Sequence, residues 1–188
     1  MLATLCVLLP AVVVAVQSPA ARAVAGVWTV ATEHGSTVTT HDGSKWPGTP
    51  GFPLAVFEEP RAFSSGAASI EFKLLGGSDD FSGGLVFGRR DGSYYYVRYN
   101  TKDGNVALWK MEGAKRAVIK HGEAHEQLEK GEWHTLELVV DGAMVRATVD
   151  GRLTVEHTLD APPAAGQLGL WTKPDATTAF RNLRVRTP

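Results

Sequence analysis

Cysteine is almost absent from this chain of 188 residues, since Cys6 is the only one. Cys6 lies inside an apolar segment at the start of the sequence, which we expect to be removed from the mature protein. The remaining chain then has no thiol, which excludes disulfide bonds, cysteine-ligated metals and a cysteine nucleophile. An exported domain without disulfides is more typical of a bacterial periplasm or exterior than of an animal secretome.

The chain also lacks an excess of charge of either sign. It has 19 Lys and Arg against 20 Asp and Glu, for a net charge of −1, and no basic run. Proteins that bind nucleic acid concentrate positive charge on one surface, so we expect no nucleic acid partner. Hydrophobic residues make up 44% and charged residues 21%, which is typical of a single globular domain with its own core.

Helical periodicity is the third absence, because no stretch after residue 26 repeats its apolar residues at helical spacing. Runs that alternate apolar and polar residues recur instead, each ended by Gly, Asp or Pro. In residues 131–151 such runs flank Asp141-Gly142, a pair that favours a tight hairpin turn. About twelve such runs predict an all-β fold, a two-sheet antiparallel sandwich over residues 26–188.

The N-terminal segment has the features of a secretory signal peptide. Leu2 to Val16 is almost wholly apolar, and Ala21-Arg22-Ala23 is a small-residue cleavage pattern. The run is shorter than the roughly 18–20 residues of a spanning helix and contains Pro10, which favours cleavage over an uncleaved membrane anchor. We therefore expect a signal peptide over residues 1–23 and a secreted or periplasmic monomer with no membrane contact after cleavage.

Four segments in order carry a family resemblance: GGLVFGRRDGSYYYVRYN, NVALWK, GEWHTLELVVDGAMVRATVDGRL and GQLGLWTKPDATTAFRNLRV. Their order resembles that of concanavalin A-like (laminin-G-like) jelly-roll domains, over residues 67–186. The sequence is most similar to the bacterial exported branch described as 3-keto-disaccharide hydrolase or as a domain of unknown function. The resemblance implies a jelly roll, a fold that hosts lectins, glucanases and adhesion modules alike.

Catalytic motifs are missing from the sequence. Retaining glucanases of this fold carry two glutamates and an aspartate alternating along one strand, which brings the carboxyl groups close enough for retention. The nearest candidate strand, residues 68–73, offers only Glu71. Neither a Gly-x-Ser-x-Gly elbow nor a His-Glu-x-x-His helix is present. We therefore assign no catalytic residue.

The strand YYYVRYN provides the best candidate binding surface. Its alternation places Tyr96, Arg98 and Asn100 on one face, opposite the apolar core face, and Trp109 lies on the neighbouring strand. A planar ring, a guanidinium fork and an amide in a row suit a sugar, which binds by ring stacking and bidentate hydrogen bonds. We expect this row to be exposed on the concave sheet, so that Arg98→Ala removes binding without unfolding. The alternative is that these residues form ordinary cross-strand pairs.

Three further residues are candidates for the ligand site. Trp46 sits in a Pro/Gly-rich loop that cannot bury a large ring by itself, so we expect it at the rim of a binding surface. The family resemblance implies that Lys173 and Asp175, in the loop after Trp171, lie beside the concave sheet. The alternative is that Trp171 closes the core and Pro174 ends the strand.

Calcium is the one cofactor that the sequence suggests. Laminin-G-like domains hold the ion at a rim with carboxylates and carbonyl groups, and Asp79 and Asp80 are the candidate pair. Their spacing matches no dedicated calcium loop, and acidic residues near glycine also form turns.

The sequence therefore predicts an exported carbohydrate-recognition domain that binds a glycan or a similar polar ligand on its concave sheet without catalysis. The first alternative is a glycoside-processing hydrolase or lyase of the 3-keto-disaccharide type, which the family resemblance implies. The second is a structural or adhesion module without a small ligand.

Overall fold

The computed structural model describes residues 20–48, 51–78 and 80–188, which fold almost wholly into strands and loops. One turn of 3-10 helix, η1 (Gly43–Lys45), is the exception within these ranges. The strands follow in chain order: β1 (Arg22–Ala25), β2 (Trp28–Glu33), β3 (Ser36–His41), β4 (Leu54–Val56), β5 (Gly66–Gly76), β6 (Ser82–Arg90), β7 (Ser93–Asn100), β8 (Asn105–Glu112), β9 (Lys115–His121), β10 (Trp133–Asp141), β11 (Met144–Val149), β12 (Leu153–Thr158), β13 (Gln167–Trp171) and β14 (Thr177–Arg186).

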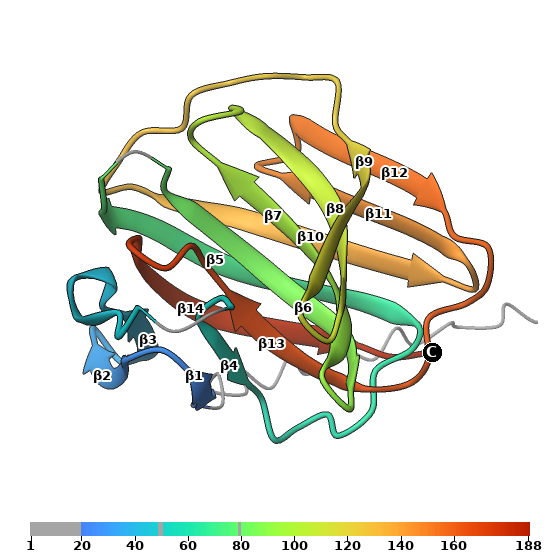
Figure 1. Ribbon diagram of the computed structural model, residues 1–188, viewed down its shortest axis with the longest axis horizontal. Helices are drawn as coiled ribbons and strands as arrows, with labels where there is room; N and C mark the ends of the chain where they lie inside the picture. Colours follow the sequence, from blue (N-terminus) through green and yellow to red (C-terminus); the bar gives the residue numbers. More distant parts are fainter. Residues whose placement is uncertain (1–19, 49–50, 79) are drawn as a thin grey trace, which may run out of the picture.

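The strands form two sheets of seven, packed face to face (Figure 1). The front sheet has the order β1-β4-β13-β6-β7-β8-β9, and the back sheet has the order β12-β11-β10-β5-β14-β3-β2. Strands β7 to β9 lie in front of β10 to β12 in Figure 1. Neighbouring strands pair antiparallel throughout both sheets. The predicted all-β antiparallel sandwich is therefore confirmed.

Tight turns join the strands where the sequence predicts them. β10 pairs with β11 as far as Asp141 and Met144, so Gly142 and Ala143 form the turn, and Gly142 has a φ of 56°. β11 pairs with β12 across Asp150-Gly151, whose φ values are 50° and 67°. Both turns need left-handed backbone, which glycine and aspartate adopt at the lowest cost among common residues.

The core lies between the two sheets and follows the alternation of each strand. In β5 the side chains of Ala68, Ile70, Phe72 and Leu74 are all fully buried, as the sequence pattern predicts. On the facing sheet a Cβ at Gly83 would lie 2.5 Å from the Phe72 ring. Glycine at this position therefore lets the two sheets approach closely around Phe72.

The predicted signal peptide, residues 1–23, lies mostly outside the described residues. Its last two residues belong to β1, which pairs antiparallel with β4 at one edge of the front sheet. The predicted cleavage after Ala23 thus falls within β1. Among the described residues no helix has the length and apolarity needed to span a membrane.

Candidate functional site

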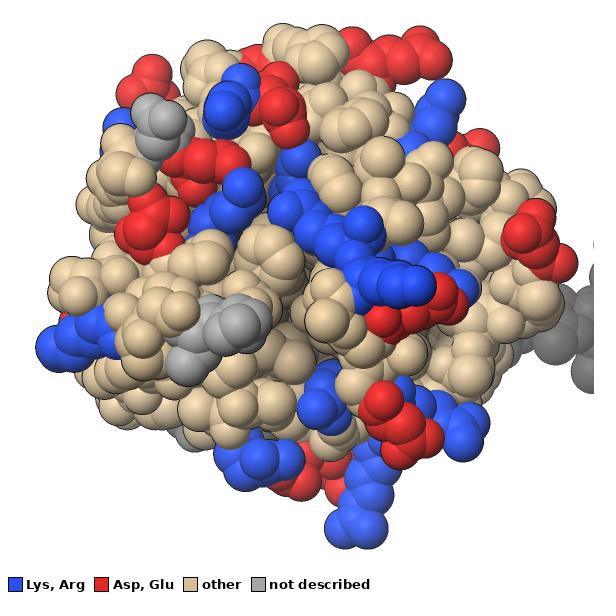
Figure 2. Space-filling model, in the orientation of Figure 1, with Lys and Arg blue, Asp and Glu red and all other residues tan. Residues whose placement is uncertain are grey.

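The front sheet carries apolar side chains on both of its faces. One face packs on the back sheet, and the other, which we call the front face, has its own buried cluster. Its members are Leu54, Val56, Val86, Tyr94, Tyr96, Met111 and Trp171, with Phe52 and Trp109 packed against them. Figure 2 looks onto this face and shows Lys and Arg side chains in a stripe across its middle, beside a hollow. This is the surface that the sequence predicts as the concave sheet.

The alternation predicted for β7 is confirmed. Val97 and Tyr99 belong to the core between the sheets, whereas Tyr96 belongs to the cluster of the front face. Backbone pairing places Trp109 of β8 directly beside Tyr96, on the same face. The structure therefore brings the predicted row of β7 together with Trp109, while their role in binding stays a prediction.

Arg98 lies between two positions that carry almost no side chain. Backbone pairing sets Gly84 of β6 beside Arg98 on one side and Ala107 of β8 on the other. A Cβ on Gly84 would lie 2.8 Å from the Val97 carbonyl oxygen and 3.1 Å from Arg98 Cβ, so glycine alone fits there without displacement. The sequence thus keeps a recess in the sheet around the arginine.

Three stacked rings, the aromatic wall, border this recess. The ring of Tyr96 lies 4.5 Å from that of Trp171 and 6.3 Å from that of Trp109, at interplanar angles of 24° and 15°. Burial raises the pKa of the Tyr96 phenol, and it raises that of the neighbouring Tyr94 to about 12. Both phenols therefore remain protonated at neutral pH and can donate a hydrogen bond.

The expectation that the row Tyr96, Arg98 and Asn100 is exposed is wrong, because the exposed fractions are 0%, 1% and 3%. Arg98 is the charged member of this buried row. Its Nη1 donates to Asn100 Oδ1 at 2.9 Å and to the Asn105 carbonyl and side-chain oxygens at 3.3 Å, and its Nη2 donates to Asp103 Oδ2 at 2.7 Å. Partial burial raises the pKa of Asp103, but the hydrogen bond and charge of Arg98 hold it below its ordinary value. The guanidinium therefore ties β7 to the turn before β8.

Several polar atoms enclosed at the front face have no hydrogen-bond partner among the described residues. They are Tyr96 Oη, Trp109 Nε1, Trp171 Nε1, Arg98 Nε and Arg116 Nε. A buried donor without an acceptor costs about 1–3 kcal/mol, so such groups are rare in native proteins. Five such groups on one face make this face the candidate for a ligand site.

A buried ion pair lies beside the arginine. Lys173 Nζ is 2.5 Å from Asp80 Oδ2, both side chains are mostly buried, and the charge of Asp80 acts on Arg98. Asp175 instead accepts hydrogen bonds from the Ser78 amide and hydroxyl, and the hydroxyl bond lowers the pKa of its carboxyl. Of the two candidates in the loop after β13, Lys173 thus lies near Arg98, whereas Asp175 is engaged by Ser78.

The calcium hypothesis gains no support from the described residues. Asp79 lies outside them, and the carboxylate of Asp80 is neutralised by Lys173. Within residues 20–48, 51–78 and 80–188 no group of three or more His, Cys, Asp or Glu side chains could hold a metal ion. Asp80 is therefore better described as one half of an ion pair than as a calcium ligand, because a calcium site needs several oxygen ligands.

Trp46 follows η1 and is partly buried. Its ring contacts His41 of β3 edge-on, at 6.2 Å between centroids. Within the described part of the chain, His41 is the aromatic residue that Trp46 contacts. Trp46 therefore lies beside the back sheet and not beside the aromatic wall. The expected role of Trp46 in binding stays a prediction.

Sequence reasoning missed two residues that cover the aromatic wall. The Arg116 guanidinium carbon lies 3.8 Å from the Trp109 ring centroid, and Phe52 lies 4.9 Å from Trp171, centroid to centroid. The signal for Arg116 was present, because the β8–β9 hairpin pairs Arg116 with Met111 and so places it on the same face. Phe52 comes from a loop whose path the sequence does not specify.

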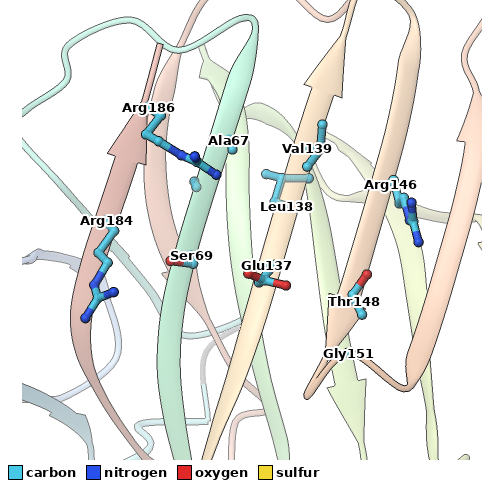
Figure 3. Close-up of a pocket in the computed structure, with 11 residues that line it drawn as sticks. Ala67, Ser69, Glu137, Leu138, Val139, Arg146, Thr148, Gly151, Arg184 and Arg186 are labelled. Carbon is cyan, nitrogen blue, oxygen red and sulfur yellow. The ribbon is translucent and has the colours of Figure 1, made fainter. Parts of the chain in front are cut away.

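A second hollow of about 640 Å³ lies on the outer face of the back sheet (Figure 3). Arg184 and Arg186 of β14 stand beside Ser69 and Ala67 of β5, which are too small to fill the space next to them. Both arginines are exposed, and none of the enclosed unpartnered polar atoms of the described residues belongs to this hollow. The front face is therefore the better candidate site.

Comparison with protein families gives one match, to the family described as 3-keto-alpha-glucoside-1,2-lyase-like domain, over residues 25–186. Among curated proteins, none matches the sequence.

Solved structures share the fold at low sequence identity. The carbohydrate binding module CBM66 from Bacillus subtilis superposes with a TM-score of 0.71 at 19% identity, over 90% of this chain and 96% of the module. Chicken galectin 2 has a TM-score of 0.53 at 10% identity, over 70% of this chain and 96% of the galectin. The Bacillus licheniformis β-glucanase has a TM-score of 0.51 at 13% identity, over 87% of this chain and 93% of the enzyme. These similarities establish the jelly-roll fold.

Proposed function

Because the chain belongs to the family of 3-keto-alpha-glucoside-1,2-lyase-like domains, we propose that its front face binds a carbohydrate. In this proposal Trp109, the partly buried ring of the aromatic wall, stacks on a sugar ring, and polar groups of the front face bind sugar oxygens. The domain acts by recognition and carries out no chemistry of its own.

The observation that carries the proposal is the group of enclosed unpartnered donors beside stacked rings. Tyr96 Oη, Trp109 Nε1, Trp171 Nε1 and Arg98 Nε each lack an acceptor among the described residues. A sugar offers both features that this site lacks, since its ring has an apolar face for stacking and its oxygens accept hydrogen bonds. The similarity to CBM66, a carbohydrate binding module, supports the same class of ligand.

Truncation of Trp109 tests the proposal. A glycan array followed by calorimetry on the best glycan should show that Trp109→Ala weakens binding about tenfold, because the variant loses a stacking ring. Trp133→Ala is the matched control, because its ring lies between Lys73 and Arg181 of the back sheet. It should bind like the wild type. Equal losses in the two variants, or no glycan bound by the wild type, would contradict the proposal.

A second candidate function is the elimination that the family description names. Asp80 Oδ1 is enclosed and has no hydrogen-bond partner among the described residues, while Oδ2 pairs with Lys173. A ring ketone makes the neighbouring C–H acidic, and a positioned carboxylate can accept that proton. If the protein is a lyase, it releases the aglycone from a 3-keto-α-glucoside, and Asp80→Asn slows release by at least about a hundredfold. Absence of release from the wild type, followed by NMR, would exclude this function.

Export is part of the proposal. The apolar segment before residue 17 and the small-residue site ending at Ala23 support it. Mass spectrometry of protein recovered outside the cytoplasm should find a mature chain starting at residue 24 or 26, and an intact Met1 would exclude cleavage.

A further inference from the structure

Two cations near the recess have a carboxylate partner. Arg98 pairs with Asp103 at 2.7 Å, and Lys173 pairs with Asp80 at 2.5 Å. Arg116, which lies over the aromatic wall, forms no ion pair with any of the described residues. The guanidinium over the aromatic wall is therefore a positive charge that no carboxylate of the described residues neutralises.

The surroundings of Arg116 are unusually apolar for an unpaired charge. Its guanidinium carbon lies 3.8 Å from the centroid of Trp109, 5.0 Å from that of Phe52 and 5.9 Å from that of Trp171. Three rings hold the guanidinium plane in place and keep water away from part of it, while its Nε has no acceptor. An ion pair formed in such a setting is stronger than one in open water.

Most of the other unpartnered atoms at the face are donors. Trp109 Nε1, Trp171 Nε1 and Arg98 Nε can only donate, Tyr96 Oη can donate or accept, and Asp80 Oδ1 accepts. A ligand that completes this site must therefore bring more acceptors than donors. A carboxylate supplies two acceptor oxygens and the charge that Arg116 lacks, in a geometry that matches the guanidinium fork.

We propose that the sugar bound at the front face is acidic, and that its carboxylate is recognised by Arg116. This inference rests on the proposed carbohydrate binding and adds the chemical class of the ligand. Arg116 is then the residue that sets specificity, and Trp109 supplies the stacking that neutral and acidic sugars share.

The experiment compares matched pairs of glycans. The probes are α-linked glucose disaccharides and the same disaccharides with glucuronate in place of one glucose, measured by calorimetry against the wild type, Arg116→Gln and Arg116→Lys. The wild type should bind the glucuronate form at least about tenfold more tightly. Arg116→Gln should bind both forms equally, and Arg116→Lys should retain part of the preference because it keeps the charge but loses the fork.

Arg184→Gln is the control for a loss of positive charge, because it makes the same change on the opposite face of the sandwich. It should keep the full preference for glucuronate. The preference should also weaken between low and high salt, because salt screens a partly exposed charge pair.

The outcomes separate this inference from the proposed function. If the wild type binds both forms equally, or if Arg116→Gln keeps the preference, the acidic ligand is wrong while carbohydrate binding stands. If the wild type binds neither these disaccharides nor any glycan on an array, both proposals fail. If Arg116→Gln does not fold, Arg116→Lys is the test. A smaller preference for the glucuronate form than in the wild type supports the inference, and an unchanged preference contradicts it.

Discussion

Arg98 has three side chains as hydrogen-bond partners inside the protein and one enclosed N–H group, Nε, without a partner among the described residues. Burial disfavours its charge, and the carboxylate of Asp103 compensates for that cost. Arg98 therefore contributes to the stability of the fold, and its replacement affects more than ligand binding. Its effect on binding and its effect on stability are therefore linked.

We predict that Arg98→Ala lowers the free energy of unfolding by about 3 kcal/mol, because it leaves Asp103, Asn100 and Asn105 without their donor. This loss of stability is at the lower end of the range for breaking a buried ion pair, because Asp103 is partly exposed. Arg152→Ala, which breaks an equally short ion pair with Glu126 on the surface, should have a much smaller effect because solvent screens that pair. Urea unfolding of both variants checks the difference, and similar midpoints would contradict it.

His41 gives the protein an acid-sensitive point. Burial lowers the pKa of its imidazole, against the opposing effects of the Ala176 carbonyl and the charge of Asp42. Its Nδ1 lies 2.8 Å from the Ala176 carbonyl oxygen, and its Nε2 is enclosed without a partner among the described residues. Since the folded pKa is below the unfolded value of 6.5, the unfolded chain binds a proton first as the pH falls.

We therefore predict that stability decreases as the pH falls below about 6.5 and that this contribution levels off below the folded pKa of His41. Unfolding in urea between pH 7.5 and 5 should show a smaller decrease for His41→Gln than for the wild type. Parallel curves for the two proteins would show that His41 does not control the acid sensitivity.

At the scale of elements, β6 is defined by two adjacent glycines that serve opposite faces. Gly83 points toward the back sheet, where Phe72 occupies the space that a side chain would need, and Gly84 points toward the front face beside Arg98. One strand thus sets both the approach of the two sheets and the depth of the recess.

We predict that Gly83→Ala lowers the free energy of unfolding by about 1–3 kcal/mol, because its methyl group would overlap the ring of Phe72 in a filled core. Gly76→Ala, at the end of β5, should change it by no more than about 0.5 kcal/mol, because a Cβ there meets only Thr177 at 3.8 Å. Thermal unfolding checks both, and equal melting temperatures for the two variants would argue against a tight contact at Gly83.

At the scale of the whole molecule, local patterns predicted the sandwich, because alternation and Asp-Gly turns act within a few residues. The face on which Tyr96 and Arg98 lie followed from the same alternation. Their burial did not, because it depends on segments far apart in the sequence: Phe52 comes from the loop before β4, and Arg116 comes from β9. β1 was missed because its first two residues were assigned to the signal peptide and the domain was expected to begin at residue 26.

The position of β9 at the edge of the front sheet gives Arg116 a second effect. An edge strand exposes unpaired backbone groups that can join another chain, and charged side chains along it discourage that pairing. Lys115, Arg116 and Lys120 supply this protection, while Val118 between them is exposed. Replacing Arg116 with an apolar residue to suit a neutral sugar would therefore also favour aggregation through β9, which couples the choice of ligand to the solubility of the protein.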